Sequence, residues 1–222
     1  MTTFLKIIFI GYCINYIMNF DTTTDIPIRY VSEEKVKKRL DKDMINLKHY
    51  DLILKDFFIK EHNEQVLKYA INKIESNNLL VTDVLAVWYL ESHFKTQIVN
   101  YQQGDNKSPI VRCNYRATGL FQLMPSTATD LGINNYIFYH YNIYQQIDLY
   151  FKYTKPYLRY MKNNNLEELY LINFLPIALV KGYETFPKRF TKGNEGLDID
   201  KNGYITRKEF RVYIIKSLKK LI

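Results

Sequence analysis

A carboxylate on an apolar helix face is the strongest candidate for chemistry in this chain. The sequence predicts a helix that starts with Thr82 as a hydroxyl N-cap. Val84, Val87 and Trp88 recur on one face of this helix, and Glu91 continues that face. Burial raises the pKa of a carboxyl group, and a general acid needs a proton held near neutral pH. A buried Glu91 paired with an Arg or Lys is the structural alternative.

A second candidate site is a calcium loop. Residues 198–209 match the twelve-residue EF-hand pattern at every diagnostic position, with oxygen-bearing side chains, a central glycine and an apolar residue in their expected places. Ca²⁺ prefers oxygen ligands, and the pattern would supply them from Asp198, Asp200, Asn202, the Tyr204 carbonyl, Thr206 through a water, and Glu209. No convincing helix enters the loop and no second hand follows. We therefore expect a structural clip with an exiting helix over 207–221, against the alternative of a metal-free turn.

Two motifs around Glu91 carry a family resemblance. The first is Glu91-Ser92, and the second is Gly119-Leu120-Phe121-Gln122 followed by Leu123-Met124-Pro125-Ser126-Thr127-Ala128. In this order they resemble the soluble lytic transglycosylases, a goose-lysozyme-like family that acts on peptidoglycan. The resemblance covers residues 79–190, about half of the chain. It implies that Glu91 is the acid and then the base, with sugar sites lined by Ser92, Asn100, Gln122 and Met124.

The residue types of the second motif suit a tight loop. Gly119 permits a positive φ or a close backbone approach, and Pro125 suits the first turn of a following helix. Between them, the Gln122 amide offers a donor and an acceptor to a sugar amide. The structural alternatives are a Gln122 that satisfies its own loop and a Met124 that fills the core.

The third motif of the family, Ala-Tyr-Asn-x-Gly, is absent from this sequence. The matching place is residues 168–178, which look like the variant pattern of phage-encoded relatives, where a Tyr or Phe precedes x-Pro-x-Ala. Tyr170 or Phe174 is then the candidate for the aromatic residue beside the acid, with core packing as the alternative. A loop similar to 198–209 also follows the catalytic domain in those relatives. The segment 101–116 is longer than usual and is a candidate for the rim of the substrate site.

The resemblance implies cleavage of the β-1,4 bond between N-acetylmuramic acid and N-acetylglucosamine by a single carboxylate, where most glycosidases use two. Glu91 would protonate the leaving oxygen, the N-acetyl group of the substrate would assist, and Glu91 would then deprotonate the 6-hydroxyl to give a 1,6-anhydro sugar. Hydrolysis, as in goose-type lysozyme, is the close alternative and needs a further acid, for which Asp105 and Asp130 are candidates. A non-catalytic virion or envelope protein that binds peptidoglycan is the alternative from another class.

The N-terminal segment predicts a membrane anchor. The run from Phe4 to Phe20 has a single charge, at Lys6, and no small-x-small cleavage site follows it. As a helix it would span about 25 Å at ~1.5 Å per residue, slightly short of a ~30 Å hydrocarbon core. We expect a membrane-anchored protein in a phage particle, with peptidoglycan, the virion membrane and other virion proteins as partners. A host envelope or periplasmic location is the alternative.

The overall composition favours an all-α fold. Eight Gly and six Pro in 222 residues are too few for a turn-rich β-sandwich. We expect a membrane-anchor helix (1–20), a linker and charged helical spacer (21–62), a lysozyme-like domain (63–190) that includes a helix over 65–74, and the calcium loop with its helix (191–222). The net charge of +8 attracts polyanions. Since there is no nucleic-acid motif and no long basic block, we expect no nucleic-acid partner.

Membrane extraction tests the N-terminal anchor. Because residues 4–20 are nearly uncharged, the full-length protein should stay with the membrane pellet after an alkaline carbonate wash. A chain that starts at residue 21 should be released by the same wash. Full-length protein in the soluble fraction, or a mature N-terminus mapped after residue 20, would contradict the anchor.

Overall fold

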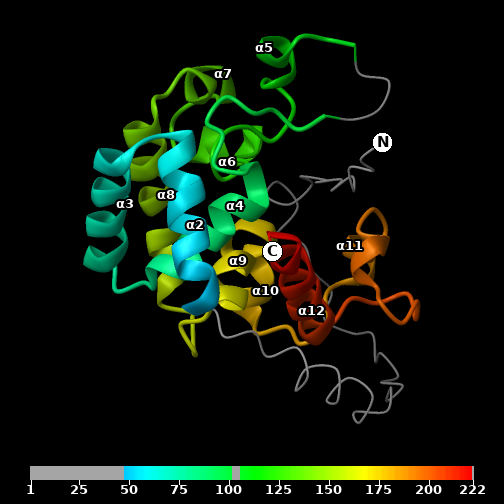
Figure 1. Ribbon diagram of the computed structural model, residues 1–222. Helices are drawn as coiled ribbons and strands as arrows, with labels where there is room; N and C mark the ends of the chain where they lie inside the picture. Colours follow the sequence, from blue (N-terminus) through cyan, green and yellow to red (C-terminus); the bar gives the residue numbers. More distant parts are fainter. Residues whose placement is uncertain (1–47, 102–105, 222) are drawn as a thin grey trace.

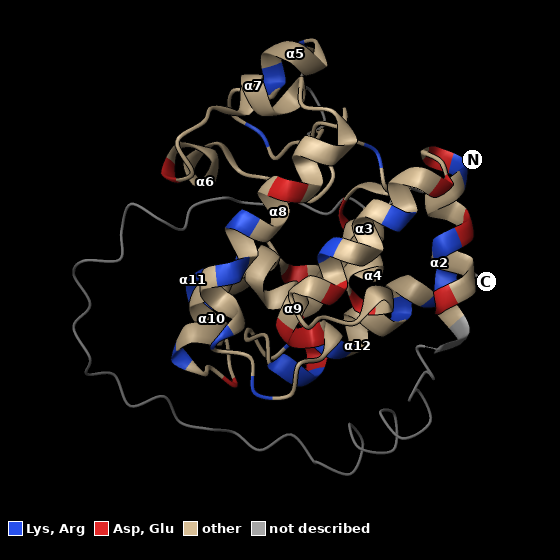
Figure 2. Ribbon diagram, turned by 90° about the vertical axis from the view of Figure 1, so that its left-hand side faces the viewer, with Lys and Arg blue, Asp and Glu red and all other residues tan. Residues whose placement is uncertain are grey.

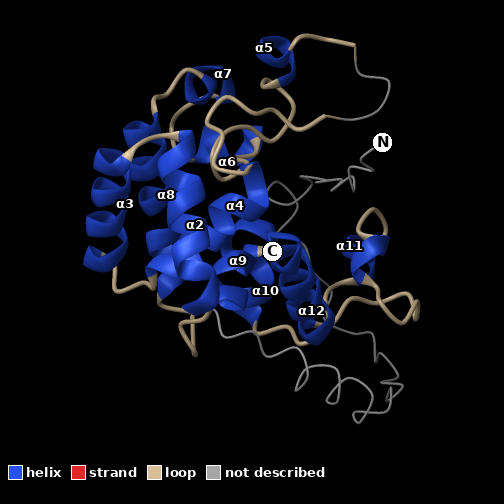
Figure 3. Cartoon of the chain, in the orientation of Figure 1, coloured by secondary structure: helices blue, strands red, loops and turns tan. Residues whose placement is uncertain are grey.

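The computed structural model describes residues 48–101 and 106–221, and this part of the chain is helical (Figure 1). In chain order the elements are α2 (Lys48–Glu61), α3 (Glu64–Ser76), α4 (Val81–Ser92), α5 (Pro109–Arg112), α6 (Pro125–Asp130), α7 (Asn135–Tyr139), α8 (Ile143–Leu158), α9 (Leu166–Phe174), α10 (Pro176–Lys181), α11 (Lys188–Thr191), η1 (Glu195–Leu197), α12 (Arg207–Leu218) and η2 (Lys219–Leu221). Figure 3 shows no strand in these residues, and the strand-like pairings among them are isolated bridges. The all-α prediction is confirmed.

Two N-terminal predictions lie outside the described residues. These are the membrane-anchor helix over 1–20 and most of the linker and spacer over 21–62. None of the described helices combines the length and the apolar character that a membrane crossing requires.

Helix α4 lies in the middle of the fold, with α2, α3, α9 and α12 packed around it (Figure 1). Every residue from Val84 to Trp88 is fully buried, whichever side of the helix it occupies. A helix that is apolar all round must be covered on all sides. The composition of α4 therefore accounts for its central place.

The start of α4 differs from the prediction. The helix begins at Val81 with Leu80 as its N-cap, and no side chain caps it. Thr82 is therefore not the cap, and its hydroxyl instead donates to a carboxylate oxygen of Asp51 on α2, at 2.8 Å. A contact between two helices thus uses the hydroxyl that the local pattern assigned to the cap. The other local predictions are confirmed, since α3 covers residues 65–74 and α6 begins at Pro125.

Helices from both ends of the described chain contribute to one core. Helix α2 buries Tyr50 and Phe58, so of the two roles that the sequence allows for this stretch, a spacer or a packing helix, it has the second. Helix α12 buries Phe210 and Ile214 in the same core. The expected boundaries after residues 62 and 190 therefore do not coincide with a break in the packing.

Ion pairs to a buried carboxylate hold α12 against α9. The Glu167 side chain is only 4% exposed, and its two oxygens accept from Arg207 Nε at 2.6 Å and from Arg211 Nε at 2.7 Å. Figure 2 shows the acidic part of α9 beside basic parts of α12. Separating a buried carboxylate from its cations is costly. Helix α12 is therefore a fixed part of the fold.

Candidate active site

Glu91 lies in the last turn of α4 and is the centre of the candidate active site. Both of its carboxylate oxygens are shielded from solvent, and neither has a hydrogen-bond partner among the described residues. The alternative of a Glu91 held by a hydrogen-bonded Arg or Lys therefore does not apply in this part of the chain. Burial raises the pKa of Glu91 well above the ordinary glutamate value of 4.5. The group is suited to hold a proton at neutral pH.

Tyr170 on α9 is the polar neighbour of Glu91. Its hydroxyl partly offsets the effect of burial and lowers the pKa of Glu91, although the two groups do not reach full hydrogen-bond geometry. Burial and the nearby Glu91 carboxylate raise the pKa of Tyr170, so its hydroxyl keeps its proton and remains a donor. The Tyr170 ring is held by stacking on Phe210 of α12, with 5.4 Å between the ring centres. The sequence offers Tyr170 and Phe174 as the aromatic residue beside Glu91, and the structure shows an interaction with Glu91 for Tyr170.

Residues 118–123, here called the glycine loop, form a closed turn. Thr118 and Leu123 exchange two backbone hydrogen bonds, of 3.0 and 2.8 Å. Gly119 has a φ of +77°, and a Cβ there would lie 2.6 Å from the Phe138 ring and 2.7 Å from the Gln146 amide. Both the conformation and the space thus require glycine. The prediction of a close backbone approach at Gly119 is confirmed.

Three helices each hold the glycine loop through one polar side chain. Ser92, which ends α4, donates from its hydroxyl to the Leu120 carbonyl at 2.7 Å. Gln146 on α8 accepts from the Leu120 N–H at 2.8 Å, and Asn173 on α9 donates to the Phe121 carbonyl at 3.2 Å. Because Ser92 follows Glu91 in the sequence, the first of these bonds places the loop directly beside the acid.

The other predicted sugar-site residues lie around this loop. Gln122 is 8% exposed and donates from its side chain to the Gly119 carbonyl at 3.0 Å, which leaves one N–H and the amide oxygen for other partners. The Ser92 side chain is fully buried. Asn100 is bonded just before the loop, since its backbone N–H donates to the carbonyl of Ala117 at 2.9 Å. Met124 is half-buried as the N-cap of α6. The structure thus gathers Glu91, Ser92, Gln122, Gly119 and Tyr170, whereas Asn100 and Met124 border the group.

The sequence patterns do not identify Gln146, Asn173 or Phe210. A signal exists for Gln146, which occupies the buried face of α8 one turn before Tyr150 and is fully buried itself. A polar residue on an apolar face is the same signal that identifies Glu91. For Asn173 and Phe210 there is no such signal, because their roles depend on how α9 and α12 pack.

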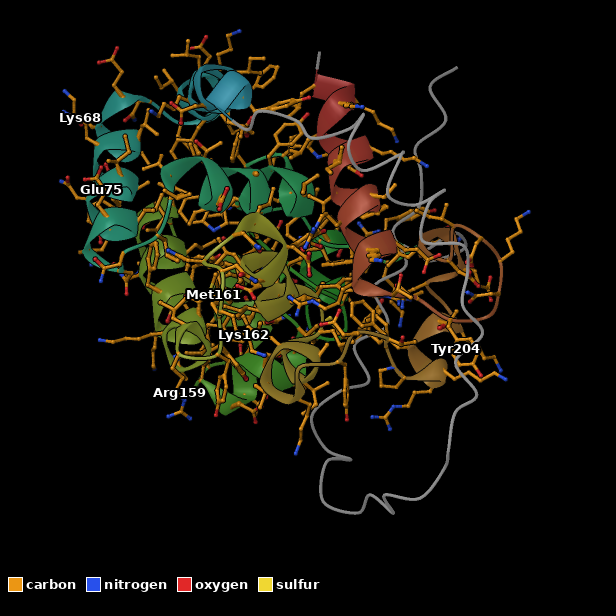
Figure 4. The ribbon with its side chains drawn as sticks, turned by 90° about the horizontal axis from the view of Figure 1, so that it is seen from below. Lys68, Glu75, Arg159, Met161, Lys162 and Tyr204 are labelled. Carbon is orange, nitrogen blue, oxygen red and sulfur yellow. The ribbon has the colours of Figure 1, made fainter. Side chains whose placement is uncertain are left out.

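The predicted calcium loop brings three acidic residues together. Ligand oxygens of Asp198, Asp200 and Glu209 all lie within 4.8 Å of one another. Two oxygens bound to one Ca²⁺ at about 2.3–2.6 Å can be at most about 5 Å apart, so one ion could contact all three. Tyr204 is another predicted ligand, and Figure 4 shows where the loop lies. It is on the side of the molecule opposite to helix α3, which carries the labelled Lys68 and Glu75. Asn202 accepts from the Tyr204 N–H, and Thr206 caps α12 together with Glu209.

The geometry agrees with a comparison with known families. Residues 68–169 match the family model described as the transglycosylase SLT domain. The matched segment contains Glu91 and the glycine loop and ends one residue before Tyr170. This domain is a lytic transglycosylase, a lysozyme-like glycosidase whose substrate is peptidoglycan. The predicted enzyme class and fold are confirmed. No curated protein and no solved structure was found to match the chain.

The Tyr170 hydroxyl should set the alkaline limit of the reaction. If Glu91 is the general acid, it must be protonated to react, so the activity should fall as the pH rises through the pKa of Glu91. Since the hydroxyl lowers that pKa, Tyr170→Phe should move the alkaline limb of kcat to higher pH. Tyr153→Phe is the control, because its hydroxyl donates to Ile172 at 2.6 Å and its loss should lower stability only. An unchanged alkaline limb in Tyr170→Phe would contradict this role.

Proposed function

We propose that this enzyme cleaves the β-1,4 bond between N-acetylmuramic acid and N-acetylglucosamine, with Glu91 as its only acid–base group. The observation that carries the proposal is the Glu91 carboxyl group, which is buried, unpaired and raised in pKa inside a lytic transglycosylase domain. Buried polar groups normally have partners, and the exceptions concentrate where chemistry occurs.

The reaction uses the same carboxyl group twice. Protonated Glu91 donates to the leaving glycosidic oxygen while the bond from that oxygen to the sugar C1 breaks and the N-acetyl oxygen of the substrate assists at C1. The Glu91 carboxylate then takes the proton of the 6-hydroxyl, whose oxygen bonds to C1, displaces the N-acetyl oxygen from C1 and closes a 1,6-anhydro ring. Burial favours the first step and the Tyr170 hydroxyl favours the ionised form that the second step needs. A pKa balanced in this way suits a group that must both give and take a proton.

The spacing of the two acidic residues on α4 supports a single-acid reaction. Pairs of catalytic carboxyl groups lie about 5–9.5 Å apart in most glycosidases. Asp83, the other buried carboxylate of α4, is eight residues from Glu91, which corresponds to about 12 Å along a helix. Asp130, a candidate for the extra acid of a hydrolase, is exposed, and Asp105 lies outside the described residues. The reaction products distinguish the two enzyme types.

Glu91→Gln tests the proposal on purified cell walls. The amide keeps the shape of the side chain but neither gives nor takes a proton, and such catalysis is worth ~10²–10⁴ in rate. The variant should bind cell walls and release almost no muropeptide. Mass spectrometry of the wild-type products should show anhydro ends, whereas reducing ends would indicate the goose-type hydrolase. If Glu91→Gln digests cell walls as fast as the wild type, Glu91 is not catalytic, and if neither protein digests them, the chain is a binding protein.

A stability measurement shows that the inactive variant is folded. Because the pKa of Glu91 is raised by folding, the wild type loses stability as the pH rises from 4.5 toward the raised pKa. Glu91→Gln does not ionise and avoids this loss. The variant should therefore melt at a higher temperature than the wild type at neutral pH, and the difference should disappear in acid.

We also propose that the loop over 198–209 binds Ca²⁺ as a structural ion. Three carboxylates this close repel one another, and a divalent cation would remove the repulsion. Asp198, Asp200, Asn202, the Tyr204 carbonyl and Glu209 would hold the ion, with Thr206 acting through a water. Glu209 stands in the first turn of α12, so the ion would stabilise the start of that helix.

Melting curves test the calcium proposal. Metal-free protein should melt at a higher temperature when Ca²⁺ is added, and a chelator should reverse the gain. Asp198→Ala should abolish the dependence on Ca²⁺. Asp130→Ala, an exposed aspartate elsewhere, is the control and should keep it. A melting temperature that responds to neither Ca²⁺ nor chelator would reduce the loop to a turn.

The location is proposed from the sequence. The nearly uncharged run over 4–20 supports a membrane anchor, and the similarity to phage-encoded relatives supports a virion membrane over a host envelope. A small enzyme that cuts peptidoglycan would there open the wall for entry or release.

A further inference from the structure

Gln146 is a fully buried amide that uses all of its hydrogen-bonding atoms on backbone groups. Its oxygen accepts from the Leu120 N–H at 2.8 Å. Its nitrogen donates to the Thr96 carbonyl at 3.0 Å and to the Tyr141 carbonyl at 3.0 Å. The side chain therefore connects the turn after α4, the glycine loop and the turn before α8.

Only an amide provides this set of bonds. The three bonds require one acceptor oxygen and two N–H donors. Among side chains of this length, only the Gln amide carries an acceptor oxygen together with two N–H donors. Gly119 is matched to it, because a Cβ at position 119 would stand 2.7 Å from the Gln146 oxygen. The absence of a side chain at Gly119 is what lets the amide reach the next residue, Leu120.

We propose that Gln146 is a positioning residue for the reaction. The inference rests on the proposed function of Glu91. Gln146 is too deeply buried to contact a glycan, so it acts through Leu120 and the neighbouring Gln122. Ser92 fixes the Leu120 carbonyl beside Glu91, and Gln146 fixes the Leu120 N–H. With both bonds in place, the glycine loop has one distance and one orientation relative to the acid.

A positioning role differs from a purely structural one in its effect on turnover. A structural residue lowers activity only in proportion to the unfolded fraction. A positioning residue lowers the turnover of protein that is fully folded, since a shift of about 1 Å can cost about 10²-fold in rate. The hydrogen bonds of Gln146 go to Leu120, Thr96 and Tyr141 and not to Glu91 or Tyr170, so the shape of the pH profile should stay.

Two neighbouring glutamines of α8 provide a matched comparison. Gln146→Met removes the three bonds at similar volume. Gln145→Met, the control, removes a side-chain bond to the Asn142 N–H that caps α8 and does not involve the glycine loop. Kinetics on soluble glycan strands, at a temperature where both variants are folded, should show a loss in kcat of about 10–100-fold for Gln146→Met and little for Gln145→Met. KM should change less than kcat.

Equal activity of the two variants at equal folded fraction would overturn the proposal. If Gln146→Met does not fold, the proposal is tested instead with Gln146→Glu, by measuring how its activity depends on pH. The introduced carboxylate still accepts from Leu120 but cannot donate, whereas its protonated form donates to one of the two carbonyls. Its activity relative to the wild type should therefore rise as the pH falls, and a ratio independent of pH would overturn the proposal.

The control for the underlying function is separate. If Glu91→Gln is active, the proposed function fails. If Glu91→Gln is inactive but Gln146→Met keeps full turnover, only the role of Gln146 fails.

Discussion

The two hydrogen bonds on Leu120 are the constraint on which the rest of the site depends. Its N–H is held from α8 by Gln146, and its carbonyl is held from α4 by Ser92, the residue next to the acid. These bonds are made in an apolar core, where they are stronger than in water and where leaving either group unpaired would be costly. The acid, the glycine loop and α8 therefore behave as one rigid group.

Glu91 is held in place at the expense of stability. A carboxyl group with both oxygens buried and unpaired is unfavourable, and the Tyr150 hydroxyl and Trp88 Nε1 nearby also have no hydrogen-bond partner among the described residues. The Trp88 and Tyr150 rings contact each other edge to face, with 5.3 Å between their centres. The surrounding apolar core has to offset these groups, which accounts for the complete burial of α4 from Val84 to Trp88. Strain of this kind is typical of functional sites.

Periodicity and local signals predict the parts of the site that depend on one helix. The buried face of α4, the place of Glu91 on it and the start of α6 at Pro125 were predictable because each depends on neighbours a few residues away. The bond from Ser92 to Leu120 spans 28 residues, and its role could not be deduced before the packing of the helices was known. The same reason explains the Thr82 hydroxyl, which the local pattern placed at the helix cap and which bonds to α2 instead. For α2 the sequence predicts a helix but does not decide between a spacer and a packing role, since its buried positions lie between exposed and charged ones.

Helices α2 and α12 lie on either side of the segment that matches the family, residues 68–169, and both pack on α4. Exchange of the matched segment alone between two genes would leave the acid-bearing helix without two of its neighbours. It would also separate Glu91 from Tyr170, which lies one residue beyond the matched segment. A viable recombinant must inherit both flanks together with the segment between them. The breakpoints that evolution can use for such a domain therefore lie before Lys48 and after Leu218, well outside the segment by which the family is recognised.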